Sequence, residues 1–282
     1  MVNGLRPQVK KAVRANHPRL CHRCLMYRLI NLSECARFQT SVRHNDKTKG
    51  TPTMSATVFP PSPPVLLPVT GIQNCFPVRR VYCVGRNYAA HAVEMGHDPS
   101  REAPFFFQKN ADNLLLPGLP FPYPGLSKNV HHEVECYVAL KSGGADIPVS
   151  EALDCIYGYG VSVDFTRRDI QDEAKKKSRP WEMAKAFEHS APVSAIARAE
   201  DIGHPFEGTI VLSRNGVDVQ HGNLNQMIWK VPEIIAALSE YVTLAPGDII
   251  LTGTPSGVGP VTRGDRISCA IKSVAQLAFD VI

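Results

Sequence analysis

Short apolar runs separated by Gly, Pro, Asn and Asp fill the chain from about Val78 to its C-terminus. Runs of this kind indicate buried strands rather than amphipathic helices, which need a longer stripe of period 3.6. Strands are predicted at Val81–Val84, Val134–Leu140, Gly158–Phe165, Thr209–Arg214, Asp248–Thr252 and Arg266–Ile271. Helices are predicted at Ala89–Met95, Asp169–Lys177 and Val231–Leu238. We therefore expect a strand-rich α+β fold.

The first 70 residues differ from the rest of the chain. Residues 1–53 contain eleven Lys and Arg against only two acids, and five prolines lie between positions 60 and 68. This composition predicts a basic, disordered leader with a stiff Pro-rich linker over residues 1–70, followed by a catalytic domain over residues 71–282. A mitochondrial presequence fits the leader best, which places the mature protein in the matrix. The alternatives are a cytoplasmic protein with a disordered leader, or Met54 as the true start.

Charge, apolar content and cysteine spacing exclude several classes of protein. The formal charge of +5 arises in the leader, because the remaining residues carry twenty basic and twenty-four acidic groups, so nucleic acid is not an expected partner. No apolar run approaches the roughly 18 residues that cross a bilayer. The eight cysteines lack the paired spacing of a disulfide framework, and the single CHRC motif at Cys21 and Cys24 has no second pair to complete a zinc site. Nucleotide-binding GxxxxGK[ST] and GxGxxG loops are absent from the sequence.

Three acidic residues form the strongest candidate site. Alternate side chains of a strand share a face, so Glu133 and Glu135 of the HHEVE motif would project together while Val134 faces the core. Adjacent carboxylates raise one another's pKa, and a divalent cation relieves their repulsion. Asp164 ends an apolar strand about thirty residues later and would complete an all-oxygen site for a hard ion such as Mg²⁺ or Mn²⁺. The alternative is a set of solvated acids on an exposed strand face.

A second group of residues suits acid–base chemistry. His91 and Glu94 lie at i, i+3 spacing on a predicted helix with Asn87 as its cap, and a carboxylate behind an imidazole makes it a stronger base toward water. Lys185 is a single cation among apolar neighbours and could stabilise an enolate or bind a carboxylate. Ordinary surface contacts explain both patterns equally well. The run Lys175–Lys177 is read as a solvated helix face.

Five sequence blocks occur in a fixed order along the chain: VGRNYAAHAVEMG, HHEVE, YGVSVDFTRRDIQDE, WEMAKAF and LTGTPSGVG. Together they closely resemble the fumarylacetoacetate hydrolase family. The match covers about Arg80 to Ile282, and the segment Asp164–Glu173 most resembles the short acylpyruvase and oxaloacetate decarboxylase branch. The family fold is a mixed β-sandwich roll with short flanking helices, and its short members usually form homodimers. Both are expected here.

The resemblance also implies roles for individual residues. Glu133, Glu135 and Asp164 would hold Mg²⁺ or Mn²⁺, and His91 with Glu94 would activate water. The implied substrate contacts are Arg168, Gln171, Lys185 and Thr254, with Lys185 also catalytic. This chain departs from its relatives in His221–Asn225, where Leu follows an Asn that more often precedes Thr or Ser, and in the pair Glu188–His189. Both departures bear on selectivity for the substrate side chain.

The expected activity is hydrolysis of a carbon–carbon bond in acylpyruvates, which are 2,4-dioxo acids, to give pyruvate and a carboxylic acid. Oxaloacetate decarboxylation is a second reaction that the same site would support, because both reactions pass through the pyruvate enolate. One alternative is a 2-oxo acid tautomerase or isomerase of the same fold. The other is a non-catalytic binding protein, which an intact His91, Glu94 and Lys185 make less attractive.

Overall fold

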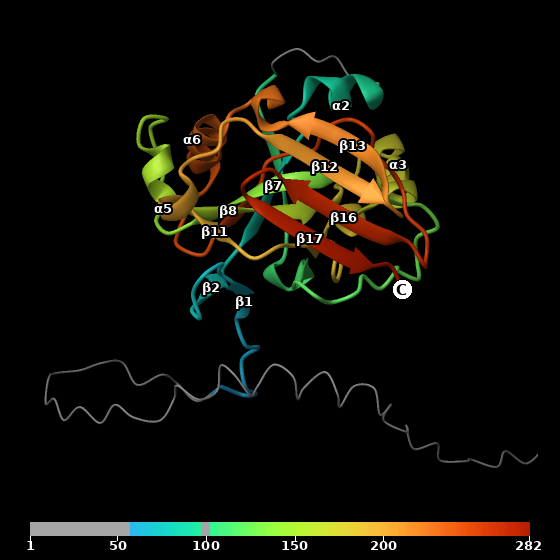
Figure 1. Ribbon diagram of the computed structural model, residues 1–282, viewed down its shortest axis with the longest axis horizontal. Coiled ribbons are helices and arrows are strands. Elements are labelled where there is room, and N and C mark those ends of the chain that lie inside the picture. The colour runs from blue at the N-terminus through green and yellow to red at the C-terminus, as the bar shows by residue number, and fades with distance from the viewer. Residues whose placement is uncertain (1–56, 97–101) are drawn as a thin grey trace, which may run out of the picture. The chain divides into compact units, whose positions relative to one another are not determined.

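The computed structural model describes residues 57–96 and 102–282 (Figure 1). All the strands and helices described below belong to one compact unit, Pro61–Ile282. The predicted presequence, the CHRC motif and Met54 lie outside the described residues. Within the described residues, no helix is long and apolar enough to cross a membrane.

A six-stranded mixed sheet forms the centre of this unit. Its strands, in spatial order, are β11 (Ala197–Arg198), β8 (Ile156–Val163), β7 (Val134–Leu140), β14 (Ile249–Leu251), β3 (Val81–Gly85) and β4 (Phe105–Lys109). The pair β14–β3 is parallel, whereas β7 is antiparallel to both β8 and β14. All seven residues of β7 are buried, because side chains pack against both of its faces. A strand in this position holds any polar side chain in a fixed place.

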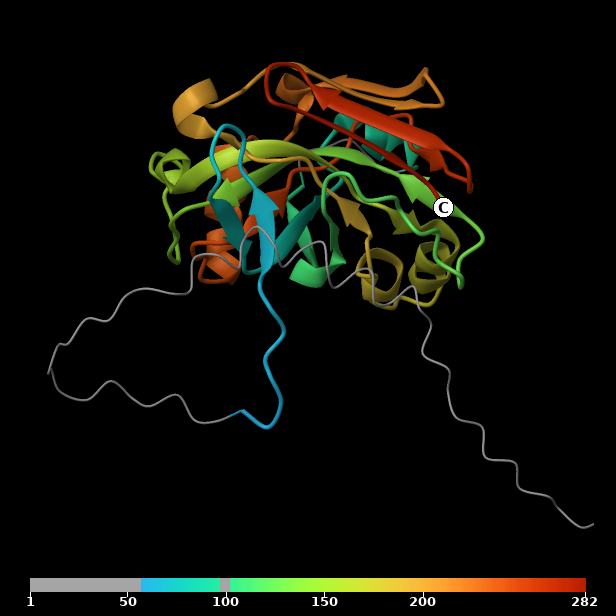
Figure 2. The same cartoon turned by 60° about the horizontal axis from the view of Figure 1, so that its bottom comes forward.

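A four-stranded antiparallel sheet packs over one face of the central sheet (Figure 2). It contains β13 (Val217–Asn223), β12 (Thr209–Arg214), β16 (Arg266–Ile271) and β17 (Ala275–Asp280). The larger hydrophobic core lies between the layers and includes Val134, Cys136 and Val138 of β7 together with Ile210 and Leu212 of β12. The expected strand-rich α+β sandwich is confirmed.

The structure corrects the predicted leader at its C-terminal end. Strand β1 (Val65–Pro68) pairs antiparallel with β2 (Cys75–Val78), and Leu67 and Val69 are buried in a second core on the other face of the central sheet. Residues 65–69 are therefore part of the folded unit. A four-residue strand that ends in Pro is too short to show a period-two pattern, and only its tertiary burial reveals it.

Two smaller sheets and short helices complete the fold. The sheets join β15 (Gly259–Pro260), β6 (Val130–His132) and β9 (Thr166–Arg167), and separately β10 (Ala191–Pro192) and β5 (Leu114–Leu115). The helices are α2 (Ala89–Glu94), α3 (Arg168–Lys176), α4 (Glu182–Lys185), α5 (Ala199–Ile202) and α6 (Val231–Tyr241), with 3-10 turns at Ala111–Asn113, Ala152–Cys155 and Leu224–Gln226. The three predicted helices are confirmed. Helices α4 and α5 are too short to give a periodic signal.

Candidate metal and substrate site

Glu133 and Glu135 lie where β6 gives way to β7. The predicted strand Val134–Leu140 is confirmed as β7, and Glu133 occupies the break between β7 and β6. Its carbonyl accepts a hydrogen bond from the backbone N–H of Asp164 at 2.8 Å, so the break is still tied to the neighbouring chain segment. Both carboxylates are buried on the face opposite Val134, which points into the larger core. The predicted sharing of one face is confirmed.

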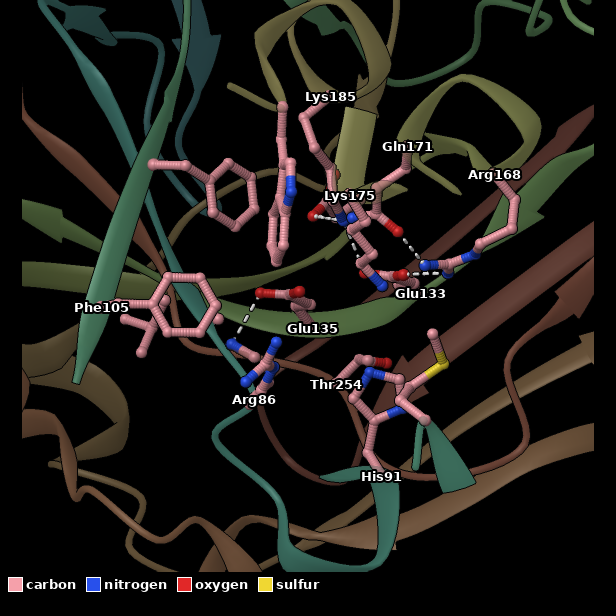
Figure 3. Close-up of a pocket in the computed structure, with 17 residues that line it drawn as sticks. Arg86, His91, Phe105, Glu133, Glu135, Arg168, Gln171, Lys175, Lys185 and Thr254 are labelled. Atoms are coloured by element: carbon pink, nitrogen blue, oxygen red, sulfur yellow. Dashed lines mark hydrogen bonds and ion pairs between the residues drawn. The ribbon is translucent and has the colours of Figure 1, made fainter. Parts of the chain in front are cut away.

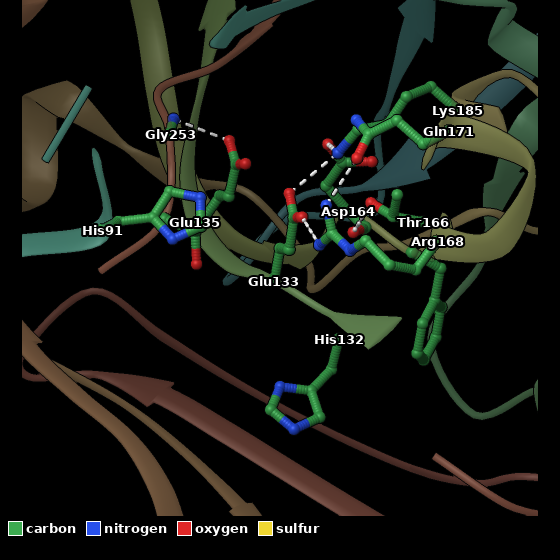
Figure 4. Close-up of polar contacts among 12 residues, drawn as sticks. His91, His132, Glu133, Glu135, Asp164, Thr166, Arg168, Gln171, Lys185 and Gly253 are labelled. Atoms are coloured by element: carbon green, nitrogen blue, oxygen red, sulfur yellow. Dashed lines mark hydrogen bonds and ion pairs between the residues drawn. The ribbon is translucent and has the colours of Figure 1, made fainter. Parts of the chain in front are cut away.

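Asp164 completes the acidic group directly after β8 ends. One carboxylate oxygen from each of Glu133, Glu135 and Asp164 lies within 4.8 Å of the others, and all three residues are buried (Figure 4). Three buried acids this close are unfavourable without positive charge between or around them. Because the donors are all oxygen, the site suits a hard divalent ion.

Lys185 and Arg168 neutralise part of the negative charge of this group. Lys185, at the end of α4, places Nζ 2.8 Å from Oε2 of Glu133 and 2.6 Å from Oδ2 of Asp164. Arg168, the first residue of α3, pairs with the other oxygen of Glu133 and donates to Oε1 of Gln171 at 2.6 Å. Burial by itself would raise the pKa of Glu133, but Lys185 and Arg168 outweigh burial and lower it. For Lys185, burial by itself would lower the pKa, but the charges of Asp164 and Glu133 outweigh burial and raise it.

Glu135 has no comparable compensation. Its Oε2 accepts a hydrogen bond from the backbone N–H of Gly253 at 2.7 Å, and no described cation forms an ion pair with it. Burial, followed by the charges of Asp164 and Glu133, holds its pKa well above the ordinary value. Glu135 is therefore the ligand that most needs a bound cation, which is the strongest sign that the acidic group fits a metal ion.

Lys109 is a site residue that the sequence analysis missed. It ends β4, it is almost completely buried, and its Nζ lies 2.8 Å from Oδ1 of Asp164. The same ammonium group donates to Oγ of Ser190 at 2.9 Å and to the backbone carbonyl of Lys185. Lys109 thus connects Asp164 to the segment that carries Lys185. The sequence signal that could have identified Lys109 is a single cation close after three apolar residues, in the segment FFFQK.

His91 and Glu94 form the predicted pair on α2. The His91 Nδ1 lies 3.3 Å from the Glu94 Oε2, and His91 is buried. The backbone N–H of Gly257 contacts the Glu94 oxygens at 3.0 and 3.1 Å, which orients the carboxylate behind the imidazole. Gly257 has φ +92°, and an added Cβ would lie 2.2 Å from the carbonyl oxygen of Val219, so this approach requires glycine.

The predicted capping role of Asn87 is wrong. Tyr88 occupies the N-cap of α2, without a side-chain capping bond. The Asn87 amide instead donates to the carbonyl oxygens of Thr252 at 2.8 Å and Trp229 at 2.9 Å, and its oxygen accepts from the Trp229 N–H at 2.7 Å. Asn87 therefore fixes the segment before α2 to the loop that follows β14, since buried backbone groups need partners.

Gln220 forms a hydrogen bond with Thr254 and is a second residue that the sequence analysis missed. The Gln220 Nε2 donates to Thr254 Oγ1 at 2.9 Å and to the Pro255 carbonyl at 3.0 Å. Its Oε1 accepts from the Val134 N–H at 3.0 Å and lies 2.8 Å from His132 Nδ1. Gln220 is buried on β13, where a single Gln in a strand gives no signal of such a role.

The acidic group and most of the predicted site residues line one cavity (Figure 3). The predicted residues that line it are His91, Glu133, Glu135, Asp164, Arg168, Gln171, Lys185 and Thr254. Glu94 is absent from the lining and reaches the cavity only through His91. Lys175 also lines the cavity, which corrects the prediction that the whole lysine run is solvated, while Lys176 and Lys177 are exposed. Arg86, Phe105 and Trp181 complete the half-buried rim.

The comparisons with known proteins agree with this arrangement. The family model described as fumarylacetoacetate (FAA) hydrolase C-terminal matches residues 80–282. Oxaloacetate tautomerase FAHD1, mitochondrial, from Mus musculus is 42% identical over 203 residues, which cover 72% of this chain and 91% of the relative. Oxaloacetate decarboxylase, mitochondrial, from Dictyostelium discoideum is 42% identical over 206 residues, with 72% and 94% coverage. Fumarylpyruvate hydrolase from Pseudomonas aeruginosa, solved with Mn²⁺ and pyruvate, is 46% identical with a TM-score of 0.79, over 80% of this chain and 99% of that one.

Proposed function

The chain belongs to the fumarylacetoacetate hydrolase family, and from that premise we propose that it is a divalent-metal-dependent acylpyruvate hydrolase. Water would add to the 4-oxo carbon, and cleavage of the bond between carbons 3 and 4 would release a carboxylic acid and pyruvate. Decarboxylation of oxaloacetate is proposed as a second reaction of the same site. The observation that carries the proposal is that three buried, converging carboxylates share one cavity with His91 and Lys185.

Glu133, Glu135 and Asp164 are the proposed ligands of Mg²⁺ or Mn²⁺. When bound there, the ion would supply Lewis-acid polarisation of the substrate's 2-oxo group. The all-oxygen donor set and the raised pKa of Glu135 support this assignment. The Mn²⁺ and pyruvate in the structure of the Pseudomonas aeruginosa relative support it further.

His91 is the proposed general base toward water. Glu94 lies on the Nδ1 side of the ring, so a neutral imidazole held with its proton on Nδ1 has Nε2 free to accept a proton. The contacts of Gly257 with Glu94 keep that carboxylate in place. Proton transfer from water to Nε2 would leave an imidazolium that Glu94 stabilises.

The remaining polar residues are the proposed binding groups. Lys185 carries a fixed positive charge beside the acidic group, where it would stabilise negative charge that develops on the departing pyruvate unit. Arg168 and Gln171 are buried together on α3 and would orient the substrate's 1-carboxylate. Thr254 would donate a hydrogen bond from the opposite wall.

A product assay on acetylpyruvate and oxaloacetate tests the proposed function. With Mg²⁺ present, we expect pyruvate and acetate from acetylpyruvate, and pyruvate with CO₂ from oxaloacetate. Glu94→Gln removes the carboxylate that supports the general base His91, so it should reduce acetylpyruvate hydrolysis by roughly 100-fold with little change in Mg²⁺ affinity. A wild-type protein that retains Mg²⁺ yet releases no pyruvate from either compound would disprove the proposal.

Oxaloacetate tautomerisation is the second candidate function, because relatives of that name are 42% identical to this chain. It exchanges keto and enol forms without forming pyruvate, so ultraviolet absorbance of the enol together with pyruvate release separates the two activities. Loss of enol signal without pyruvate favours the tautomerase. A protein inactive in both assays would leave the non-catalytic binding role.

Residues 1–53 are proposed to direct the protein to the mitochondrial matrix, on the strength of their basic, acid-poor composition and of relatives named as mitochondrial. A fluorescent reporter fused after residue 53 should enter mitochondria, and a diffuse cytoplasmic signal would contradict the proposal.

A homodimer is proposed from the family resemblance and is tested by light scattering on residues 57–282.

A further inference from the structure

We propose that the rim of the cavity is a second carboxylate-binding subsite formed by Arg86 and Lys175, so that the preferred substrates are 2-oxo acids with a second, distal carboxylate. This inference rests on the proposed function only in placing the 2-oxo acid end at the acidic group. It separates dianionic substrates from acylpyruvates with an apolar tail, which the proposed function treats alike.

Arg86 and Lys175 differ from the other cations of the cavity in having no carboxylate partner. Lys185, Lys109 and Arg168 each form an ion pair with Glu133 or Asp164. Among the described residues, no carboxylate lies within salt-bridge distance of Arg86 or Lys175. Both extend into the cavity that contains Glu133 and Glu135 (Figure 3). Two cations without carboxylate partners in one cavity favour an anionic ligand.

An aromatic wall holds the two cations on the same part of the rim. The Arg86 guanidinium lies 5.4 Å from the centre of the Phe105 ring, and the Lys175 ammonium lies 5.4 Å from that of Trp181. The two rings meet edge to face, with 5.5 Å between their centroids. Cations over aromatic faces remain available to a ligand on their other side. All four residues are half-buried, so they lie nearer to solvent than the buried acidic group.

The backbone at Arg86 is also unusual. Arg86 has φ +57°, in the left-handed region that bulky residues seldom adopt. Its neighbour Gly85 leaves space for Phe105, because a Cβ at Gly85 would lie 2.0 Å from the Phe105 Cζ. A long cationic side chain kept at a strained position beside a ligand cavity is typical of a functional residue.

The charges around Lys175 agree with an anion between the cations. Burial, and then the charge of Arg168, lowers the pKa of Lys175; Asp172 opposes this, and Arg86 contributes a further lowering. A carboxylate placed between Arg86 and Lys175 would relieve that repulsion. A terminal methyl group in the same place would gain nothing from either cation.

Matched ligands that are not cleaved test the subsite without turnover. 2-Oxoglutarate and 2-oxopentanoate have the same chain length and differ only in a terminal carboxylate or methyl group. By calorimetry on the Mg²⁺-loaded protein, we expect 2-oxoglutarate to bind at least roughly 10-fold more tightly, the effect of one charge-assisted hydrogen bond. Lys175→Gln and Arg86→Gln should each reduce this preference severalfold.

Lys176→Gln is the matched control, because it removes the same charge from the exposed side of the same helix and should leave the preference intact. Equal affinity for the two acids in the wild-type protein would overturn the inference. So would a preference that Lys175→Gln and Arg86→Gln leave unchanged.

Cleavage assays distinguish this inference from the proposed function. Succinylpyruvate and butanoylpyruvate again differ only in a terminal carboxylate or methyl group, and the ratio of their kcat/KM values should exceed roughly 10. If the protein cleaves neither compound but still prefers 2-oxoglutarate, the proposed function fails and the subsite stands. If it cleaves both at equal rates, the proposed function stands and the subsite fails.

Discussion

Gln220 Nε2 donates to Thr254 Oγ1 at 2.9 Å, and this bond determines which way the threonine hydroxyl can donate. The amide cannot be reversed, because the Val134 N–H must donate to its oxygen and the Pro255 carbonyl must accept from its nitrogen. Oγ1 of Thr254 is therefore an acceptor toward Gln220, and its proton remains free for a ligand in the cavity. Gln220 does not line the cavity, yet it determines that Thr254, which does, presents a hydrogen-bond donor to a ligand.

Gln220→Glu should reverse that polarity at nearly constant shape. The introduced carboxylate would accept from Thr254, so the hydroxyl would no longer donate to a bound substrate carboxylate. We expect KM to rise roughly 10-fold with a smaller change in kcat, since a hydrogen bond to a charged group contributes about 1.5–3 kcal/mol. Steady-state kinetics check this. Thr254→Ser, which retains the hydroxyl, should stay within a few fold of wild type, and an unchanged KM in Gln220→Glu would contradict the assignment.

Substitutions of the two glutamates should affect the metal-free protein in opposite directions. Glu135→Gln removes a buried carboxyl group whose pKa is raised by burial and neighbouring acids, so its melting temperature without metal should equal or exceed that of wild type. Glu133→Gln removes the carboxylate partner of Arg168 and one of the two carboxylates that pair with Lys185, and we expect a cost of about 3–5 kcal/mol. Both variants should lose most of the Mg²⁺-induced rise in melting temperature. Thermal unfolding with EDTA or Mg²⁺ measures each effect, and a lower metal-free melting temperature for Glu135→Gln would refute this account.

Lys109→Met should destabilise the protein chiefly in the absence of metal. Asp164 is completely buried and would lose one of its two cationic partners, which we expect to cost about 2–4 kcal/mol. Saturating Mg²⁺ supplies positive charge to the same carboxylate, so the difference from wild type should narrow. Lys141→Met, at an exposed lysine, is the control and should show little change. A deficit that Mg²⁺ leaves unaltered would mean that Lys109 acts by packing alone.

Acidification should weaken the fold through His204. Its Nδ1 lies 2.7 Å from the Tyr159 hydroxyl, and burial, followed by the charge of Lys141, lowers the pKa of His204. Because the folded state favours neutral His204, this contribution is present above the unfolded pKa of about 6.5 and is lost as the pH falls through the lower folded value. Melting temperatures measured with EDTA should therefore fall less steeply below pH 6.5 in His204→Gln than in wild type. The exposed His221→Gln should follow wild type, and identical slopes for His204→Gln and wild type would rule out His204 as a contributor.

Local patterns were enough to find the acidic group. Side chains alternate along any strand, so the two-residue spacing of Glu133 and Glu135 placed them on one face before their neighbours were known. The same rule placed Asp164 opposite the apolar residues of β8. The i, i+3 geometry of α2 brought His91 toward Glu94 in the same way. Family resemblance, rather than any local pattern, supplied the sandwich roll and the substrate contacts other than Lys185.

The sequence by itself therefore determined which acids share a face and which His and Glu are paired, because these relationships depend on neighbours within one strand or one helical turn. Tertiary structure alone decided which cations accompany them. Lys109 donates a hydrogen bond to the carbonyl of Lys185, which is 76 positions away in the sequence, and Gln220 donates to Thr254, which is 34 positions away. The partner of a buried polar group depends on how distant strands and loops pack. The same packing makes Val65–Pro68 a strand. It also leaves Arg86 facing the cavity without a carboxylate partner among the described residues.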